Sequence, residues 1–220
     1  MADLIRNLIE SLRRAGGNLR LANQYRAERD DCDARGAAKA RCENLEAYLR
    51  KFDTSPPRLI VLGEAAGYQG CRFSGIPFTS EFVLSNHSFF AGGQFKRSSC
   101  RERIWREPTA SIVWELIAEL DARDQPLMWA TVPFHPHKPG NPLSNRTPTR
   151  VEAEAGMAYF KSLREIFPDA RIVAAGKIAA ANLTKAGLPH APIRHPSHGG
   201  KAEFRAGVSA ALAALNGRQK

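Results

Sequence analysis

The sequence predicts an α/β protein in which helices cover both faces of a mainly parallel sheet. Four short apolar runs, at residues 58–63, 127–132, 171–175 and 191–194, are typical of strands. Helix-forming segments separate these runs along the chain. Strands that are joined through helices need long crossover connections, and such connections favour parallel pairing.

Each expected helix has its own signal. Residues 110–120 repeat apolar side chains at helical spacing. Residues 149–167 open with a Thr-x-x-Glu pattern, which is typical of a capping box at a helix start. Residues 177–186 and 202–215 are rich in alanine, the residue with the highest helix propensity.

The first 52 residues have helical periodicity in two places. The apolar side chains that carry it are Ile5, Leu8, Ile9 and Leu12, then Leu45, Tyr48, Leu49 and Phe52. The charged stretch 22–42 lies between them, and we expect it to be an exposed helix or loop. A Ser-Pro-Pro sequence at 55–57 follows. We therefore divide the chain into an N-terminal helical segment, 1–55, that packs on a core domain, 56–220.

The charge balance favours a polyanionic partner. The chain has 32 Lys and Arg against 22 Asp and Glu, a net charge of +10. Each phosphate contact by a basic side chain releases condensed counterions, so a nucleic acid is the expected partner. No apolar run approaches the roughly 20 residues that span a bilayer. The N-terminus also lacks the cleavage site of a secretory signal. We expect a cytoplasmic protein that does not bind membranes.

The cysteine spacing argues against a metal cluster. Cys32, Cys42, Cys71 and Cys100 are far apart and include no C-x-x-C pair. A zinc ribbon needs such pairs, and an iron–sulfur cluster usually has them. We predict reduced thiols, with no cofactor.

Four glycines lie within GEAAGYQGCRFSGIPF, residues 63–78, directly after the first strand. The stretch lacks the Lys and hydroxyl of a Walker loop, and its glycines do not have the G-x-G-x-x-G spacing of a dinucleotide site. Nucleotide binding is therefore disfavoured. What remains is a tight loop with one acid, Glu64, at its base and an aromatic, Phe78, at its end, with a second acid, Glu81, three residues further on.

Three motifs follow predicted strands: GEAAG at 63–67, PFHPH at 133–137 and HPSHGG at 195–200. Ligands gather at the carboxyl ends of parallel strands, so we expect these motifs to form one site. The second motif, with its neighbours Lys138 and Arg146, is suited to contact a polyanion backbone. His135 and His137 could alternatively hold a metal, and a metal-dependent hydrolase that also uses His195 and His198 is one open hypothesis.

Taken together and in this order, the motifs resemble those of the uracil-DNA glycosylase superfamily. GEAAG followed by SGIPF resembles the first motif of the GEAPG-type branches, families 4 and 5, with the spacing of family 5. The run Asn145 to Thr149 resembles a stretch after the middle motif of family 4. HPSHGG resembles the closing HPS motif. The iron–sulfur cysteines of these branches are absent, so the resemblance implies a relative without the cluster.

The resemblance implies a three-layer α/β/α sandwich with a central four-stranded sheet, and catalysis without a metal. Such an enzyme flips a deaminated base out of DNA and hydrolyses its N-glycosidic bond. Phe78 would stack on the base, and His195 would stabilise negative charge on the uracil O2. Glu64 is favoured as the catalytic carboxylate that lines the pocket, and Glu81 is the rival group for orienting water.

The remaining site residues follow from the same resemblance. The base pocket would be lined by Gly63, Ala65, Gly67, Tyr68, Phe78 and Thr131. DNA contacts would come from His135, His137, Lys138, Asn145, Arg146, Ser197, His198, Gly199 and Gly200, the last four forming a minor-groove wedge.

Three departures from the family pattern concern specificity. Ala65 stands where the best-studied branch has an Asp, and Gly67 stands where it has a Tyr that excludes thymine. The middle strand supplies no Asn to read the uracil edge. Either a backbone amide, Thr131 or a nearby Asn such as Asn141 reads the base, or the activity is weaker or shifted towards other deaminated bases.

The sequence therefore predicts a monofunctional uracil-DNA glycosylase of base excision repair, acting on uracil and other deaminated bases at the bacterial nucleoid. The alternative is a binding module of the same fold that binds damaged or single-stranded DNA without turnover.

Overall fold

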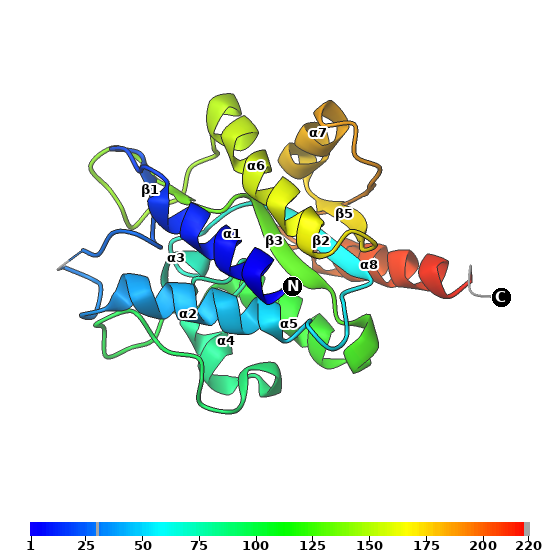
Figure 1. Cartoon of the computed structure of the whole chain (residues 1–220), viewed down its shortest axis with the longest axis horizontal. Helices are drawn as coiled ribbons and strands as arrows, with labels where there is room; N and C mark the ends of the chain where they lie inside the picture. The colour runs from blue at the N-terminus through cyan, green and yellow to red at the C-terminus, as the bar shows by residue number, and fades with distance from the viewer. Residues whose placement is uncertain (30, 218–220) are drawn as a thin grey trace.

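The central element of the computed structural model, which describes residues 1–29 and 31–217, is a four-stranded parallel sheet (Figure 1). Its strands run in the order β3-β2-β5-β6. Their bounds are β2 Leu59–Ala65, β3 Leu127–Val132, β5 Arg171–Ala175 and β6 Ala191–Ile193. All four coincide with predicted strands, so the α/β prediction is confirmed. Residues 30 and 218–220, which fall in the two predicted units, lie outside the described part of the chain.

The two inner strands explain the apolar runs of the sequence. Val61 of β2 pairs with Met128 of β3 on one side and with Val173 of β5 on the other. All three side chains are buried. A parallel strand that is covered on both faces needs apolar residues at successive positions rather than at alternate ones.

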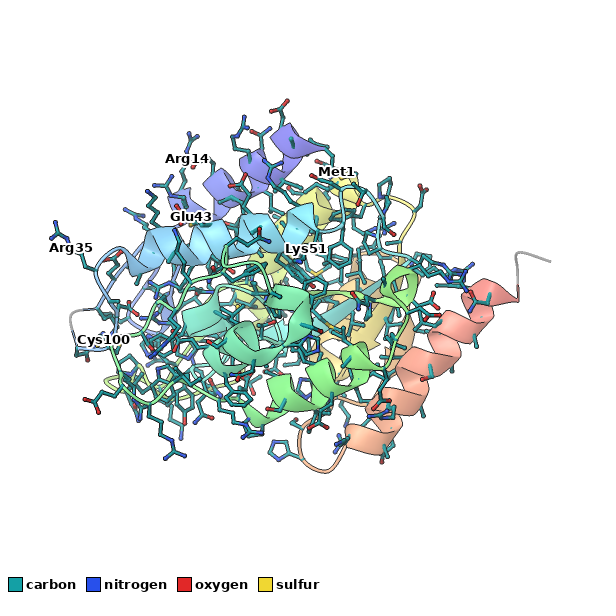
Figure 2. The ribbon with its side chains drawn as sticks, turned by 90° about the horizontal axis from the view of Figure 1, so that it is seen from below. Met1, Arg14, Arg35, Glu43, Lys51 and Cys100 are labelled. Atoms are coloured by element: carbon teal, nitrogen blue, oxygen red, sulfur yellow. The ribbon has the colours of Figure 1, made fainter. Side chains whose placement is uncertain are left out.

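Helices cover both faces of the sheet, as the three-layer prediction requires. One face carries α6 (Arg150–Ile166) and α7 (Lys177–Lys185), and the other carries α5 (Pro108–Ala118) and α8 (Lys201–Asn216). Figure 2 shows α5 and α8 side by side on their face. Ion pairs join these two helices: Lys201 with Glu115 and Arg205 with Glu119.

Helix α6 begins as its sequence predicts. The Thr149 hydroxyl accepts a hydrogen bond from the Glu152 amide, and the Glu152 carboxylate accepts one from the Thr149 amide. These reciprocal bonds satisfy backbone donors that a helix start leaves unpaired. Further along, Gly156 lets α6 approach β3 closely, because a Cβ at this position would lie 2.0 Å from the Thr131 carbonyl oxygen.

The N-terminal segment shares the hydrophobic core of the sheet domain. Helices α1 (Ala2–Arg14) and α2 (Ala37–Arg50) bury the apolar faces expected from their periodicity. The Tyr48 hydroxyl also accepts a hydrogen bond of 2.7 Å from the Met128 amide. Because β3 is an edge strand, this contact pairs a backbone donor that the sheet leaves free.

Several short elements have no counterpart among the predicted ones. They are β1 (Leu21–Ala22), which pairs antiparallel with β4 (His135–Pro136), the short helices α3 (Cys71–Ser74) and α4 (Glu81–Asn86), and the 3₁₀ turns Ser88–Phe90 and Ala122–Asp124. Each is too short to produce a periodic pattern. None of the helices in the described ranges is long and apolar enough to cross a membrane.

The prediction that 22–42 is exposed is wrong for part of that stretch. Asp33 and Arg41 have side chains that are only 1% and 0% exposed. Asp33 also pairs with Arg72 of α3, whose guanidinium donates to both carboxylate oxygens at 3.0 Å. We call Asp33, Arg41 and Arg72 the buried ionic cluster. Burial raises the pKa of Asp33, but the hydrogen bonds and charges of the two arginines outweigh it, and that pKa is lowered overall.

The buried ionic cluster continues into the long connection between β2 and α5. Arg41 donates to the Ser98 hydroxyl, which donates in turn to the Phe73 carbonyl. The Ser98 and Ser99 amides then donate to the Glu81 carboxylate at 2.8 and 2.9 Å. The N-terminal segment, α3 and the connection are therefore held together by one chain of polar contacts.

Replacing Asp33 by Asn should destabilise the fold strongly. The change leaves two buried guanidinium groups without their counter-charge, and breaking a buried pair typically costs about 3–5 kcal/mol. Urea unfolding followed by circular dichroism measures the loss. Asp3, whose pair with Arg6 is exposed, is the matched control, and Asp3→Asn should cost less than about 1 kcal/mol. Equal costs for the two variants would contradict the importance of the buried cluster.

Candidate active site

A pocket of about 540 Å³ opens at the carboxyl end of the sheet, where the three predicted motifs meet. Its size is in the range of small-molecule sites. The residues of its wall that the chemistry concerns are Glu64, Ala65, Gly67, Phe78, Glu107, Asn145, Arg146, His195, Ser197 and Lys201. The three motifs thus come together at one pocket, through Glu64 near the end of β2, Pro136 after β3 and His195 after β6.

Phe78 is held in an uncommon conformation on one wall of the pocket. Its φ angle is +55°, in the left-handed region that a bulky residue rarely adopts. The preceding turn imposes this geometry, because the Ser74 hydroxyl bonds with the carbonyl oxygens of Ile76 and Thr79. A Trp114 ring N–H also donates to the Phe78 carbonyl. Strained residues persist where their surroundings over-determine them, frequently at functional sites.

Gly63 provides the space for the Phe78 ring. A Cβ at position 63 would lie 2.3 Å from the tip of that ring. The ring therefore packs against bare backbone at the end of β2, and any larger residue at this position would displace it. Gly63 thus shapes the pocket by supporting Phe78.

The His195 ring lies beside Phe78, with ring centroids 5.8 Å apart. The Ser197 backbone N–H donates to its Nδ1, and the Ser197 hydroxyl also lies 2.7 Å from that nitrogen. An imidazole nitrogen that accepts a backbone N–H carries no proton, so the proton of the neutral ring is on Nε2. Burial lowers the pKa of His195 to about 4. At neutral pH the ring is an uncharged donor on the pocket wall.

Two carboxyl groups line the same pocket. Glu64, near the end of β2, was predicted, and burial raises the pKa of its carboxyl. Glu107, directly before α5, was missed by the sequence analysis, and burial raises its pKa to about 7. No motif marks Glu107, which lies 29 positions after Phe78 in the chain. The one available signal was its place before a proline that starts a helix.

Asn145 reaches the pocket from the loop that precedes α6. Its Oδ1 accepts a hydrogen bond of 2.9 Å from the Tyr68 amide. Its Nδ2 lies 3.9 Å from the position that a Cβ on Gly67 would occupy. Of these two asparagines, Asn145 rather than Asn141 therefore lies on the pocket wall.

Glu81, Thr131 and Tyr68 are among the predicted site residues that lie away from the pocket wall. Glu81 is fully buried, and its carboxylate accepts hydrogen bonds from Ser98 and Ser99. Thr131 is also fully buried and donates its hydroxyl to the Gly63 carbonyl at 2.8 Å. The Tyr68 ring packs edge-on against Trp105. The spacing of Glu81 from Phe78 matches a family pattern, but helix α4 turns its side chain into the core.

The PFHPH loop has a structural role that its sequence did not reveal. His135 is fully buried and its Nε2 lies 2.9 Å from the Ser144 carbonyl, while His137 is 8% exposed. Arg146 pairs with Glu152 and donates to the carbonyls of His137 and Arg20. The two histidines are therefore not available for surface contact with DNA, whereas Lys138 is exposed.

The HPSHGG loop projects at the pocket mouth. His198 and Gly199 are both exposed and both have positive φ angles, +52° and +79°. Gly200 is buried. A Cβ at this position would lie 2.1 Å from the His195 carbonyl oxygen, so no larger residue fits there. The loop turns sharply away from His195 and presents its tip to solvent. The wedge role of Ser197 to Gly200 stays a prediction.

The metal-hydrolase hypothesis requires a ligand set that the described ranges do not contain. Within residues 1–29 and 31–217, no group of three or more His, Cys, Asp or Glu side chains is arranged to hold a metal ion. His135 and His137 lie together, with ring centroids 5.6 Å apart, but His195 lies on the pocket wall beside Phe78.

The buried His135 and the half-buried His195 should make the folded protein sensitive to acid. Burial lowers the pKa of His135 to about 3 and that of His195 to about 4, from an ordinary value of 6.5. Between about pH 6.5 and 4 the unfolded chain binds protons that the folded chain does not. The free energy of unfolding should therefore decrease as the pH is lowered through this range.

Urea unfolding at pH 4, 5, 6 and 7 measures this dependence. His135→Gln should make the fall with pH shallower than in the wild type, whereas the change at exposed His198, His198→Gln, should leave it unchanged. An unaltered slope in His135→Gln would mean that His135 is protonated in the folded state.

The fold has a known structural counterpart. Over 99% of this chain and 97% of the other, the structure is similar to the crystal structure of wild-type SMUG2 from Pedobacter heparinus, a member of the uracil-DNA glycosylase superfamily, with a TM-score of 0.67 and 16% sequence identity. No family model and no curated protein sequence matches the chain. At this identity the likeness concerns the fold, and it confirms the three-layer architecture that the sequence resemblance implied.

Proposed function

We propose that this protein is a DNA glycosylase that flips a deaminated base, foremost uracil, into the pocket and hydrolyses its N-glycosidic bond. The observation that carries the proposal is the pairing of Phe78 and His195. The Phe78 ring, whose backbone has a strained φ angle, has its centroid 5.8 Å from that of the His195 ring. The Ser197 N–H that donates to Nδ1 of His195 leaves Nε2 as the donor nitrogen. A stacking surface and a neutral hydrogen-bond donor are what a departing base anion needs.

The energetics of base capture are consistent with this arrangement. Extruding a base from a duplex costs a few kcal/mol. Stacking on one aromatic side chain recovers roughly 1–3 kcal/mol. The apolar wall formed by Phe78, Pro77 and Ile112 would therefore offset much of the cost of flipping.

The bond cleavage uses the polar groups of the same pocket. As the bond between the base nitrogen and C1′ breaks, its electron pair moves onto the base and negative charge develops on O2. Nε2–H of His195 donates to this oxygen. Water adds to C1′ and loses a proton, and the base gains one. Of the two acids predicted from the sequence, Glu64 is the one that would orient the water, because it lines the pocket whereas Glu81 does not.

The charge of the chain suits a DNA partner. The net charge is +10, and exposed cations adjoin the site motifs: Lys201 lines the pocket, Arg194 directly precedes His195 and Lys138 directly follows the PFHPH motif. The alternative function, a module that binds damaged DNA without turnover, would use the same surface. It is favoured by the absence of an Asp at position 65, which is Ala.

Excision by His195→Ala should be about 10²–10³-fold slower than by the wild type, because a donor to developing negative charge is typically worth that much. The measurement is single-turnover cleavage, after alkali, of oligonucleotides that contain uracil, hypoxanthine or xanthine, in single and double strands. Affinity for DNA should be nearly unchanged. If the wild type binds the oligonucleotides but produces no abasic sites at high concentration, the binding-module alternative holds instead.

The two candidate acids can be separated by paired substitutions. Glu64→Gln should slow excision by about 10²–10⁴-fold, the range of general acid–base effects, with little change in thermal stability. Glu81→Gln should do the opposite, lowering stability while the folded fraction retains excision, since Glu81 bonds only to the connection between β2 and α5. The reverse pattern would return the water-orienting role to Glu81.

A further inference from the structure

We propose that Glu107 and Asn145 together read the edge of the flipped base and select a ring carbonyl over an exocyclic amino group. The inference rests on the proposed function, because it assigns the specificity of the same pocket. It fills the role that the middle strand leaves empty, since Thr131 is committed to the Gly63 carbonyl.

The first observation is the position of the Glu107 side chain. Glu107 occupies the N-cap position of α5, directly before Pro108, yet its carboxyl does not cap the helix. It lies instead against the glycine-rich loop. A Cβ on Gly67 would be 2.3 Å from Oε1 of Glu107, and a Cβ on Gly70 would be 2.3 Å from Oε2. The two glycines thus make room for this carboxyl at the pocket wall.

The second observation is that the carboxyl has no structural partner. In the part of the chain that the structure describes, its oxygens form no ion pair or hydrogen bond, and burial alone governs its protonation. The side chain is half-buried, and it lines the pocket. A ligand that displaces water from the pocket would have to bond to this carboxyl, because a desolvated polar group without a partner is costly.

The third observation is the fixed orientation of Asn145. Because the Tyr68 amide donates to Oδ1, that atom is the oxygen, and Nδ2 is left as a donor. Nδ2 and the Glu107 carboxyl both lie near Gly67, at 3.9 and 2.3 Å from the same Cβ position. The pocket wall therefore presents an amide donor beside a carboxyl group.

These two groups match the edge that deamination creates. Uracil and hypoxanthine have a carbonyl oxygen where cytosine and adenine have an amino group, and an N–H beside it. The Asn145 donor would bond to that oxygen and would oppose an amino group. A protonated Glu107 carboxyl would donate to the second lone pair of the same carbonyl oxygen. A carboxylate has no proton to donate, and it repels a carbonyl oxygen.

Protonation of Glu107 should therefore control excision near neutral pH. The titratable and charged groups that face this part of the pocket are Glu64 on β2, Cys71 on α3, Arg146 before α6, His195 and His198 after β6, and Lys201 on α8. Burial, rather than any one of these charges, raises the pKa of Glu107 to about 7. The carboxyl is protonated below that pH, so base reading should weaken as pH rises through about 7.

The test measures base preference by binding, independently of cleavage. Full-length protein is titrated with single-stranded oligonucleotides that carry 2′-fluoro-2′-deoxyuridine or 2′-fluoro-2′-deoxycytidine, whose electron-withdrawing fluorine resists cleavage. The wild type should prefer uracil. Glu107→Ala and Asn145→Ala should each reduce that preference by about tenfold, the equivalent of one hydrogen bond of 1.4 kcal/mol. Exposed Glu102, changed to Ala, is the matched control and should retain it.

Glu107→Gln distinguishes base reading from water activation and from a structural role. Its amide keeps a donor and an acceptor but does not titrate. Base preference and excision at pH 6 should stay within about tenfold of the wild type, and the decline of excision above pH 7 should disappear. If Glu107 orients water instead, Glu107→Gln will excise far more slowly at every pH while its base preference is unchanged.

The outcomes separate this inference from the proposed function. Excision by the wild type with an undiminished uracil preference in Glu107→Ala overturns the inference and leaves the glycosylase intact. A uracil preference that depends on Glu107, in a protein that never excises, supports the inference and overturns the glycosylase. Equal binding of both oligonucleotides by the wild type overturns base reading, whether or not excision occurs.

Discussion

The buried contact of Asp33 with Arg41 and Arg72 is the interaction on which the arrangement of the pocket depends. It joins the N-terminal segment to α3, and through Ser98 it reaches the connection that ends at Glu107. Two guanidinium groups in a dry interior require a counter-charge within hydrogen-bond distance. This requirement brings three segments that are distant in sequence to fixed positions beside the carboxyl end of the sheet.

Desolvation is the common cause of the site's chemistry. It keeps the His195 imidazole neutral, so that Nε2 can donate without carrying charge, and it raises the pKa of both Glu64 and Glu107. Burial is the main cause of each of these three pKa shifts, and it acts on each group separately. The strained backbone of Phe78 is a second local cost. The packing and hydrogen bonds around the site offset the free-energy cost of desolvation and that of the strained backbone.

The site residues that could be predicted either follow the ends of strands or belong to a motif that resembles a known one. Glu64 and His195 directly follow apolar runs, and parallel strands bring such positions to one edge. Phe78 was found because its loop resembles a known motif. Glu81 was placed in the site by spacing along the chain, which says nothing about the direction of a side chain on α4. Glu107 belongs to no pattern, and only packing against Gly67 and Gly70 brings it to the pocket.

The sequence by itself determined the α/β class, the four strands and the capping box of α6, because apolar periodicity and short-range hydrogen bonding are local properties. Tertiary structure decided which acids face the pocket, why Gly67 and Gly70 are glycine, and that the charged stretch 22–42 is partly buried. Those outcomes depend on contacts between residues far apart in the chain. A buried ion pair or a desolvated carboxyl leaves no periodic trace in the sequence.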